Sequence, residues 1–285
     1  MHNSCAPWLP GRKHRYAIVP ALNALSVVLP VLNERDNLAE LIPELTDVLT
    51  PLVNSLEILV VDDSSTDGTD ELMATLVRHN DRITYISRRG QEKSLPQSLS
   101  DGVQAAKHPH VAWMDADGSM SADSLGSLFA AFQELGDERT VVVGSRFVSG
   151  GGFKGVEIAG ETRSWEVIKN LRDSNDSVSA VILSRLLNRY LWLMLDRCCR
   201  DLASGFIVAA KSDVLGIGLR GTYGDYCVRF IYLAHRAGYR IAEVPYVCLV
   251  RRHGESKTGT TLWGLIRRGI PYVSLPFKIR RQQVE

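Results

Sequence analysis

Two aspartates separated by one residue, Asp115 and Asp117, are the side chains of this sequence best suited to holding a metal ion. They directly follow residues 111–114, a short apolar run typical of a buried strand. Two close carboxylates repel each other, and a divalent cation is the usual partner that relieves the repulsion. Oxygen ligands with open positions suit Mg²⁺ or Mn²⁺, which complete their shells with water and phosphate oxygens. We therefore predict a magnesium or manganese site; alone, the pair is also compatible with a solvated acidic turn.

Two further polar clusters follow apolar runs in the same way. Asn33 and Glu34 come after the run at residues 25–29, and residues 62–67, Asp-Asp-Ser-Ser-Thr-Asp, come after the run at 58–61. Asp and Asn commonly cap the helices that follow strands in α/β proteins. We therefore predict that Asn33 and Asp67 cap the next helices, whatever else they do.

The elements that position these clusters are short apolar runs alternating with segments whose apolar residues recur at helical spacing. Continuous apolar strands that alternate with amphipathic helices predict an α/β fold with a mostly parallel central sheet and helices on both faces. Ligands of such sheets bind outside the carboxyl ends of the strands, where all three clusters would meet. The runs predicted to be strands are residues 25–29, 58–61, 83–86, 111–114 and 141–143, with helices near 38–49, 72–77, 95–106 and 125–135.

The second half of the chain is less regular. Residues 149–180 begin glycine-rich and continue polar and charged, which predicts a loop or insertion. Helices are predicted at 181–195 and 226–237, and an edge strand at 240–250, because Pro245 cannot donate to a neighbouring strand. The predicted organisation is an irregular leader (1–22), a catalytic domain (23–259) and a basic, apolar tail (260–285).

Composition excludes several classes of protein. Hydrophobic residues make up 45% and charged residues 23% of the 285 residues, as in an ordinary globular domain. The net charge of +1 gives no general affinity for nucleic acid. No run approaches the roughly 20 apolar residues that a membrane-spanning helix needs.

The order of the three clusters resembles the family 2 glycosyltransferases, which have the Rossmann-like glycosyltransferase-A fold. In that family a proline-led loop with Asn-Glu follows the first strand, Asp-Asp-x-Ser-x-Asp follows the second, and the Asp-x-Asp metal motif follows the fourth. Five further segments resemble the branch that contains dolichol-phosphate mannose synthase and the polyprenyl-phosphate glycosyltransferases. They are residues 144–147 (GSRF), 184–188 (SRLLN), 201–206 (DLASGF), 243–245 (EVP) and 251–257 (RRHGESK).

The resemblance implies roles for the residues around a nucleotide-sugar donor. Asp63 would hydrogen-bond the base, while Pro30, Asn33 and Glu34 would lie near the base and ribose. Asp115 would touch the ribose, and Asp115 and Asp117 would hold the metal that bridges the donor diphosphate. Ser119 stands where the family often has glutamine, and we expect it, with water, to complete the metal shell.

The same resemblance implies an acceptor site for a lipid phosphate. Arg146 and Arg185 would meet that phosphate, while Ser256 and Lys257 would close over the donor diphosphate and reach the acceptor phosphate too. Negative charge grows on the leaving oxygen, which Lys257 and a metal held by Asp117 would stabilise. A phosphate acceptor is already anionic and needs little help from a base.

These inferences predict a metal-dependent, inverting hexosyltransferase that uses a UDP- or GDP-sugar and a polyprenyl or dolichyl phosphate. The tail interleaves apolar and aromatic residues with arginine and lysine, which favours peripheral binding at the cytosolic membrane face. One alternative is a hydroxyl acceptor, with Asp225 as the candidate base; another is a catalytically weak nucleotide-sugar-binding protein. Departures from the family at Ser94, Pro96 and Ile207 leave the identities of the sugar and the acceptor open. A membrane-anchored partner subunit and a homo-oligomer are both compatible with the sequence.

Overall fold

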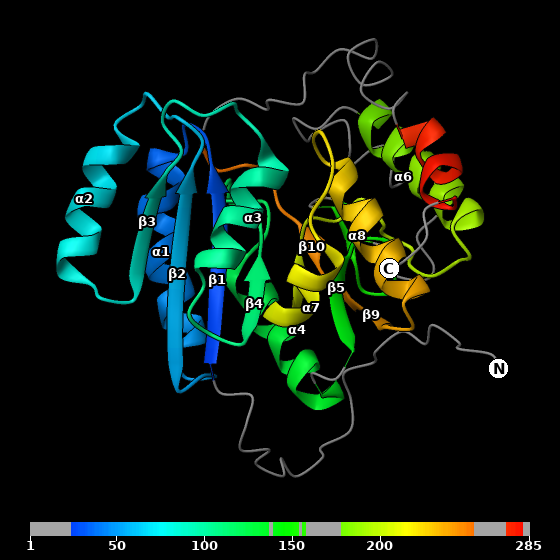
Figure 1. Ribbon diagram of the computed structural model, residues 1–285, viewed down its shortest axis with the longest axis horizontal. Helices are drawn as coiled ribbons and strands as arrows, with labels where there is room; N and C mark the ends of the chain where they lie inside the picture. The colour runs from blue at the N-terminus through cyan, green and yellow to red at the C-terminus, as the bar shows by residue number, and fades with distance from the viewer. Residues whose placement is uncertain (1–23, 137–138, 154–155, 158–177, 254–271, 282–285) are drawn as a thin grey trace.

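A seven-stranded sheet forms the centre of the protein in the computed structural model, which describes residues 24–136, 139–153, 156–157, 178–253 and 272–281. Its strand order is β3-β2-β1-β4-β8-β5-β9 (Figure 1). All neighbouring strands are parallel except β8, which runs antiparallel between β4 and β5. The strands are β1 (Ala24–Val31), β2 (Ser55–Asp62), β3 (Ile83–Ser87), β4 (His110–Trp113), β5 (Thr140–Ser145), β8 (Ile207–Ala210) and β9 (Arg240–Pro245). The prediction of a mostly parallel sheet is confirmed, although β8 was not predicted.

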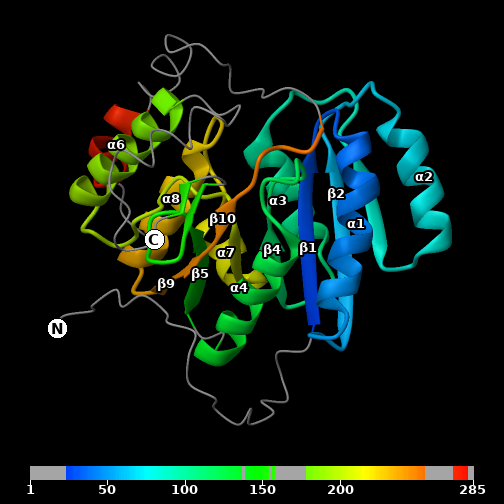
Figure 2. The same cartoon turned by 180° about the vertical axis from the view of Figure 1, so that it is seen from behind.

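Helices cover both faces of this sheet, as predicted, and each face has its own apolar core (Figures 1 and 2). One core contains residues of α1 (Arg35–Leu49), α2 (Thr69–His79) and α4 (Ala122–Leu135). The other contains residues of α3 (Leu95–Ala105), α6 (Val178–Met194), α7 (Lys211–Ile217) and α8 (Asp225–Arg236). Gly102 on α3 shows how closely the layers meet, since a Cβ there would lie 2.4 Å from Cγ1 of Val28.

The register of β1 and β2 brings two of the polar clusters together. Val31, the last residue of β1, is level with Asp62, the last residue of β2. Both strands are almost wholly buried, which explains their continuous apolar sequence. The loops that follow them are therefore fixed side by side at the carboxyl edge of the sheet.

The cap predicted at Asn33 is wrong, because its side chain has a long-range partner. Asn33 has a left-handed φ of 55°, and its Oδ1 accepts the backbone N–H of Thr66 at 2.7 Å. Helix α1 begins at Arg35, whose N–H donates to Oδ2 of Asp67 at 2.9 Å. Oδ1 of Asp67 accepts from Thr69 at the start of α2. Asp67 thus accepts hydrogen bonds from the first residues of two helices. A capping rule based on neighbouring residues alone does not predict this.

The segment predicted as one strand at 240–250 divides into two. As predicted, β9 lies at the edge of the main sheet and ends at Pro245. The chain then forms β10 (Val247–Cys248), which pairs with β6 (Gly152–Phe153) and, through it, with β7 (Val156–Glu157). The remainder of the predicted 149–180 insertion falls largely outside the described residues.

The described part of the C-terminal tail, residues 272–281, is helical over 272–279 and contacts α6 and α8. The hydroxyl of Tyr190 on α6 donates to the carbonyl of Val273 at 2.8 Å, and Leu275 and Ile279 are buried. Within the described ranges, no helix is both long and apolar enough to cross a membrane. The predicted leader and the first part of the tail lie outside those ranges.

Candidate active site

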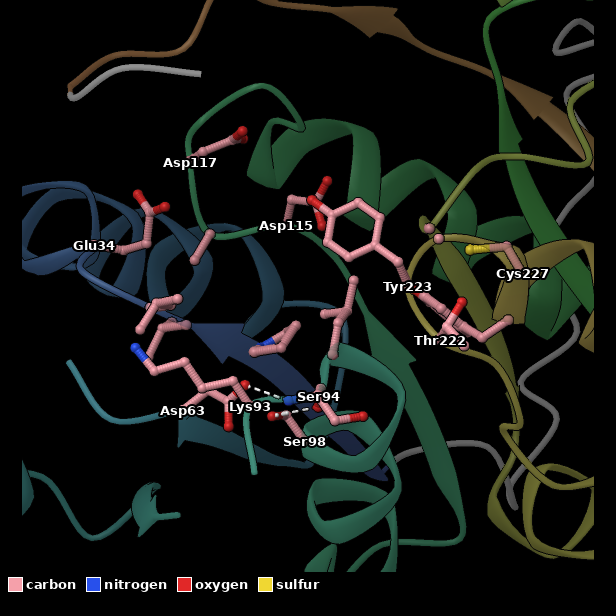
Figure 3. A pocket seen from close by; sticks show the side chains of 18 of the residues that line it. Glu34, Asp63, Lys93, Ser94, Ser98, Asp115, Asp117, Thr222, Tyr223 and Cys227 are labelled. Carbon is pink, nitrogen blue, oxygen red and sulfur yellow. Dashed lines mark hydrogen bonds between the residues drawn. The ribbon is translucent and has the colours of Figure 1, made fainter. Parts of the chain in front are cut away.

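A cavity of about 490 Å³ opens at the carboxyl ends of β1, β2 and β4. Figure 3 shows Glu34 and Asp63 on one side, Tyr223 and Cys227 on the other, and Asp115 between them. The predicted site residues that line it are Pro30, Glu34, Asp63, Asp115 and Asp117. The prediction that the three clusters meet at one edge of the sheet is confirmed.

The carboxylates of Asp115 and Asp117 both face this cavity. Desolvation by the surrounding protein, followed by repulsion from Asp117, raises the pKa of Asp115 to about 7, while Arg251 and Arg146 oppose the shift. A pair that repels itself in this way suits a divalent cation, because the cation offsets both charges. Two carboxylates leave coordination positions for water and phosphate, as Mg²⁺ and Mn²⁺ prefer. The residues therefore fit the predicted metal.

Ser119 contacts Asp117 through its backbone. Its N–H donates to Oδ1 of Asp117 at 2.9 Å, and its carbonyl accepts the N–H of Leu249 at 2.8 Å. Ser119 does not line the cavity. Its role as a side-chain metal ligand stays a prediction.

Arg251 is the cation beside the metal motif. Its guanidinium spans two acids, with Nη2 2.9 Å from Oδ2 of Asp117 and Nη1 3.1 Å from Oε1 of Glu34. Glu34 also accepts from Nδ2 of Asn37 at 2.6 Å and is only 7% exposed. The arginine thus joins the loop after β1 to the loop after β4.

Asp63, the predicted base-binding residue, is held in place from two directions. The buried Arg88 guanidinium donates to its Oδ1 at 2.5 Å, and the N–H of Ser94 donates to its Oδ2 at 2.7 Å. Arg88 also bonds Asp101 and Ser98 on α3. A carboxylate accepts about four hydrogen bonds, so Asp63 keeps capacity for a ligand.

Asn33 is an exposed residue that joins two loops beside the cavity. Its N–H donates to Oγ of Ser65 at 2.7 Å, and its side chain bonds Thr66, so it ties the loop after β1 to the loop after β2. Asn33 is absent from the residues that line the cavity. Direct contact with the nucleotide remains a prediction for this residue.

Of the four residues predicted to bind the acceptor, the structure describes two, Arg146 and Arg185. Arg146 forms a bidentate pair with the buried Asp201, with both nitrogen–oxygen distances 2.8 Å, and its guanidinium also packs over Phe147 and Phe153. Arg185 lies half-buried on α6 and does not line the cavity. Ser256 and Lys257 lie outside the described residues. Roles for all four in binding the acceptor stay predictions.

Asp225, the base considered for a hydroxyl acceptor, is engaged with its own loop. Oδ1 accepts the backbone N–H groups of Thr222 and Tyr223 at 2.8 and 3.0 Å, and Oδ2 accepts Nε of Arg229 at 3.1 Å. Burial acts to raise the pKa of Asp225, but these hydrogen bonds outweigh it and leave the pKa lowered. A carboxylate stabilised in this way is a weak base.

Several cavity residues were not assigned from sequence. Lys93 and Arg251 are the basic residues that line the described part of the cavity, and Tyr223, Tyr226 and Tyr272 line it too. The arginine lies within a segment matched to the family, but no role was assigned to it. The tyrosines come from the loop before α8, from α8 itself and from residues 272–279, so no local spacing marks them as one group.

Comparison with known sequences is consistent with this geometry. The family model of glycosyl transferase family 2 matches residues 26–190. The dolichol-phosphate mannosyltransferase of Pyrococcus furiosus is 29% identical over 244 residues, which are 85% of this chain and 62% of that relative. The polyprenol monophosphomannose synthase of Mycolicibacterium smegmatis is 27% identical over 242 residues, covering 81% of this chain and 79% of the relative. The chain thus spans less than two thirds of its archaeal relative.

Solved structures show the same fold. One is glucosyl-3-phosphoglycerate synthase from Mycobacterium tuberculosis, in complex with Mn²⁺, UDP-glucose and phosphoglyceric acid. It superposes with a TM-score of 0.60 at 17% identity, covering 90% of this chain and 79% of the other. The predicted fold class and the resemblance in sequence are confirmed.

Proposed function

The chain belongs to glycosyl transferase family 2, and from this premise we propose that it moves a hexose from a UDP- or GDP-sugar to a polyprenyl or dolichyl phosphate. The observation that carries the proposal is the convergence of Asp63, Asp115 and Asp117 on one cavity, joined there by Arg251. One side can hold a nucleotide and the centre can hold a metal. The two curated relatives named above support a polyprenyl-type acceptor.

The donor nucleotide occupies the side of the cavity formed by Pro30, Glu34 and Asp63. Asp63 is rigid because Arg88 and Ser94 fix both of its oxygens, so it presents a preorganised acceptor to an N–H of the base. Uracil and guanine both carry such an N–H, so this contact alone admits either donor. Arg251 and Lys93, the cations of the described cavity wall, offset the charge of the diphosphate.

Asp115 and Asp117 would hold Mg²⁺ or Mn²⁺. Such an ion supplies Lewis-acid stabilisation of the charge that develops on the leaving diphosphate. The protein's own part is to hold the carboxylates close together and to keep Arg251 beside them. Lys257, outside the described residues, is proposed to add positive charge near the same phosphates.

A phosphate acceptor requires less of the described residues than a hydroxyl acceptor does. A hydroxyl must lose its proton as it attacks, which requires an available base. The oxygens of Asp225 are occupied by Thr222, Tyr223 and Arg229, and its lowered pKa makes it a poor one. A phosphate oxygen needs no base, and Arg146 and Arg185 are the proposed cations for it.

An exposed apolar surface supports peripheral binding at a membrane, which we place at the cytosolic face. Five large side chains of α6 and residues 272–279 are about half exposed or more, and we call them the apolar face: Ile182 (49%), Leu186 (61%), Leu193 (51%), Val273 (52%) and Phe277 (54%). The two segments lie side by side (Figures 1 and 2). Neither contains an acidic residue, whereas α6 carries Arg185 and Arg189 and residues 272–279 carry Lys278. Apolar and basic side chains together suit an anionic lipid surface.

Donor binding can be tested without knowing the sugar. We expect UDP or GDP to raise the melting temperature in the presence of Mn²⁺ and to have little effect with EDTA, because ligands stabilise the folded state by mass action. ATP and CTP serve as controls for general nucleotide binding. Equal stabilisation by all four nucleotides, with or without metal, would contradict the assigned donor site.

A further inference from the structure

Residues 247–253, which we call the strap, lead from the edge of the sheet back to α1. Figure 2 shows this segment running from β10 across to the end of α1 that lies beside the cavity. Two backbone hydrogen bonds attach it to the loop that carries the aspartate pair. The N–H of Leu249 donates to the carbonyl of Ser119 at 2.8 Å, and the N–H of Arg252 donates to the carbonyl of Asp117 at 3.2 Å.

The far end of the strap is held by one face of α1. Asn37, Glu40 and Glu44 are spaced three and four residues apart, so their side chains project from the same side of the helix. Arg252 bonds both oxygens of Glu44, at 2.7 and 2.9 Å, and reaches Glu40 at 3.3 Å. Nε2 of His253 lies 2.8 Å from Oε1 of Glu40. We call these side-chain contacts of Arg252 and His253 the anchor.

Asn37 completes the attachment through the backbone of His253. Its Nδ2 donates to the carbonyl of His253, and its Oδ1 accepts the N–H of the same residue, both at 3.2 Å. The same Nδ2 also donates to Glu34. The face of α1 that holds the strap is therefore continuous with the acid that receives Arg251.

Gly118 shows that the strap lies in contact with the aspartate loop. A Cβ on this residue would fall 2.8 Å from Cγ of Arg252, and its φ of 78° favours glycine. Arg251 stands between the two attachments and is the strap residue that lines the cavity. Glu40, Glu44 and Arg252 do not line it, so their side chains can act on the cavity only indirectly, through Arg251 and the aspartate loop that the strap contacts.

We propose that Glu40, Glu44 and Arg252 are positioning residues that hold Arg251 at the metal motif and so set the affinity for the donor diphosphate. This inference rests on the proposed function of the cavity. Single, partly exposed ion pairs contribute little, but here three contacts among four side chains form one cluster. An arginine that is in place for only part of the time binds its ligand with an affinity reduced by that fraction. The anchor keeps that fraction high.

Charge reversal tests the anchor without creating a cavity in the apolar core. We expect Arg252→Glu and Glu44→Arg each to raise the donor KM by roughly 5- to 20-fold while changing kcat by less than about threefold, because the bound donor itself orders Arg251. The double variant Glu44→Arg/Arg252→Glu restores the pair and should return the KM to within about threefold of wild type. Asp81→Arg, an exposed reversal ahead of β3 at the opposite end of the sheet, is the matched control.

Hydrogen exchange provides a readout that does not depend on activity. The amides of Leu249, Arg252 and His253 are hydrogen-bonded in the folded protein, so loss of the anchor should speed their exchange, and the double variant should slow it again. Unchanged exchange in both single variants would overturn the anchor, whether or not the protein is a transferase. Faster exchange with an unchanged donor KM would overturn the positioning role. Failure of the wild type to bind any nucleoside diphosphate would instead overturn the proposed function.

Discussion

The guanidinium of Arg251 lies 2.9 Å from the carboxylate of Asp117, so the protein carries a cation of its own beside the metal motif. A divalent ion that binds Asp117 must weaken this pair. The donor diphosphate then offers Arg251 a new anionic partner. We therefore expect the binding of metal and the binding of donor to be coupled through this side chain.

Replacing Arg251 by alanine should therefore affect metal and donor in opposite directions. Without nucleotide, Mn²⁺ should bind roughly fivefold more tightly, since a partly exposed ion pair contributes up to about 1 kcal/mol. The donor kcat/KM should fall by about 10²-fold, because a charge that stabilises the leaving group is lost. Titration calorimetry with Mn²⁺, alone and with UDP or GDP, measures both effects. Weaker Mn²⁺ binding without nucleotide would contradict the competition.

Asp117→Asn should abolish transfer while leaving the fold intact. The variant loses a metal-ligand charge but keeps an oxygen for the N–H of Ser119. We expect transfer to fall at least about 10³-fold and the melting temperature to change by about 2 °C or less. Asp123→Asn, an exposed change on the first turn of α4, is the control. Undiminished turnover in EDTA would show that the metal assignment is wrong.

The parts of the fold that were predictable from sequence depend on local periodicity. Strands β1 to β5 and helices α1 to α4 are marked by apolar runs and by helical spacing, which every element carries in its own residues. Strand β8 was missed because its four residues follow a glycine-containing loop and have no turn signal after them. Its antiparallel place between β4 and β5 is a tertiary feature.

The candidate site, too, was predictable only where local sequence marks its residues. Asp63, Asp115 and Asp117 could be placed at the cavity because each directly follows a strand of a parallel sheet. Their partners could not, since Arg88 is 25 residues from Asp63, and Arg251 is 134 residues from Asp117. Such pairs are visible only when the chain has folded.

Asp225→Asn distinguishes the two acceptor hypotheses. If Asp225 is structural, loss of its bond to Arg229 should lower the melting temperature by about 2–6 °C, while kcat for a lipid-phosphate acceptor changes less than about threefold. The free-energy difference from wild type has a defined pH dependence. Because the pKa of Asp225 is lowered on folding, its contribution is complete above about pH 5 and disappears as the pH falls below about 4.

Denaturation measured between pH 3 and pH 8 checks that dependence. A kcat loss of about 10³-fold at unchanged stability would instead identify Asp225 as a general base. That result would favour a glycan or small-molecule hydroxyl as the acceptor.

The apolar face can be tested apart from catalysis. Leu186→Asp and Phe277→Asp should each reduce co-sedimentation with vesicles of phosphatidylserine and phosphatidylcholine at least about fivefold, because a buried apolar side chain contributes about 1.5–3 kcal/mol. Leu215→Asp on α7, where the leucine is 45% exposed, provides a control outside this face. Binding that is equally weak in wild type and variants would contradict a membrane role for α6 and residues 272–279.

Transfer to a lipid phosphate is the most direct test of the proposed function. Purified protein would be incubated with Mn²⁺, radiolabelled UDP-glucose or GDP-mannose, and a short-chain polyprenyl phosphate in detergent, with the matching polyprenol as the hydroxyl control. We predict a glycosylated lipid phosphate, formed with one equivalent of nucleoside diphosphate, lost in EDTA and absent with polyprenol. Transfer to the polyprenol, or metal-dependent donor binding with neither lipid modified, would contradict it.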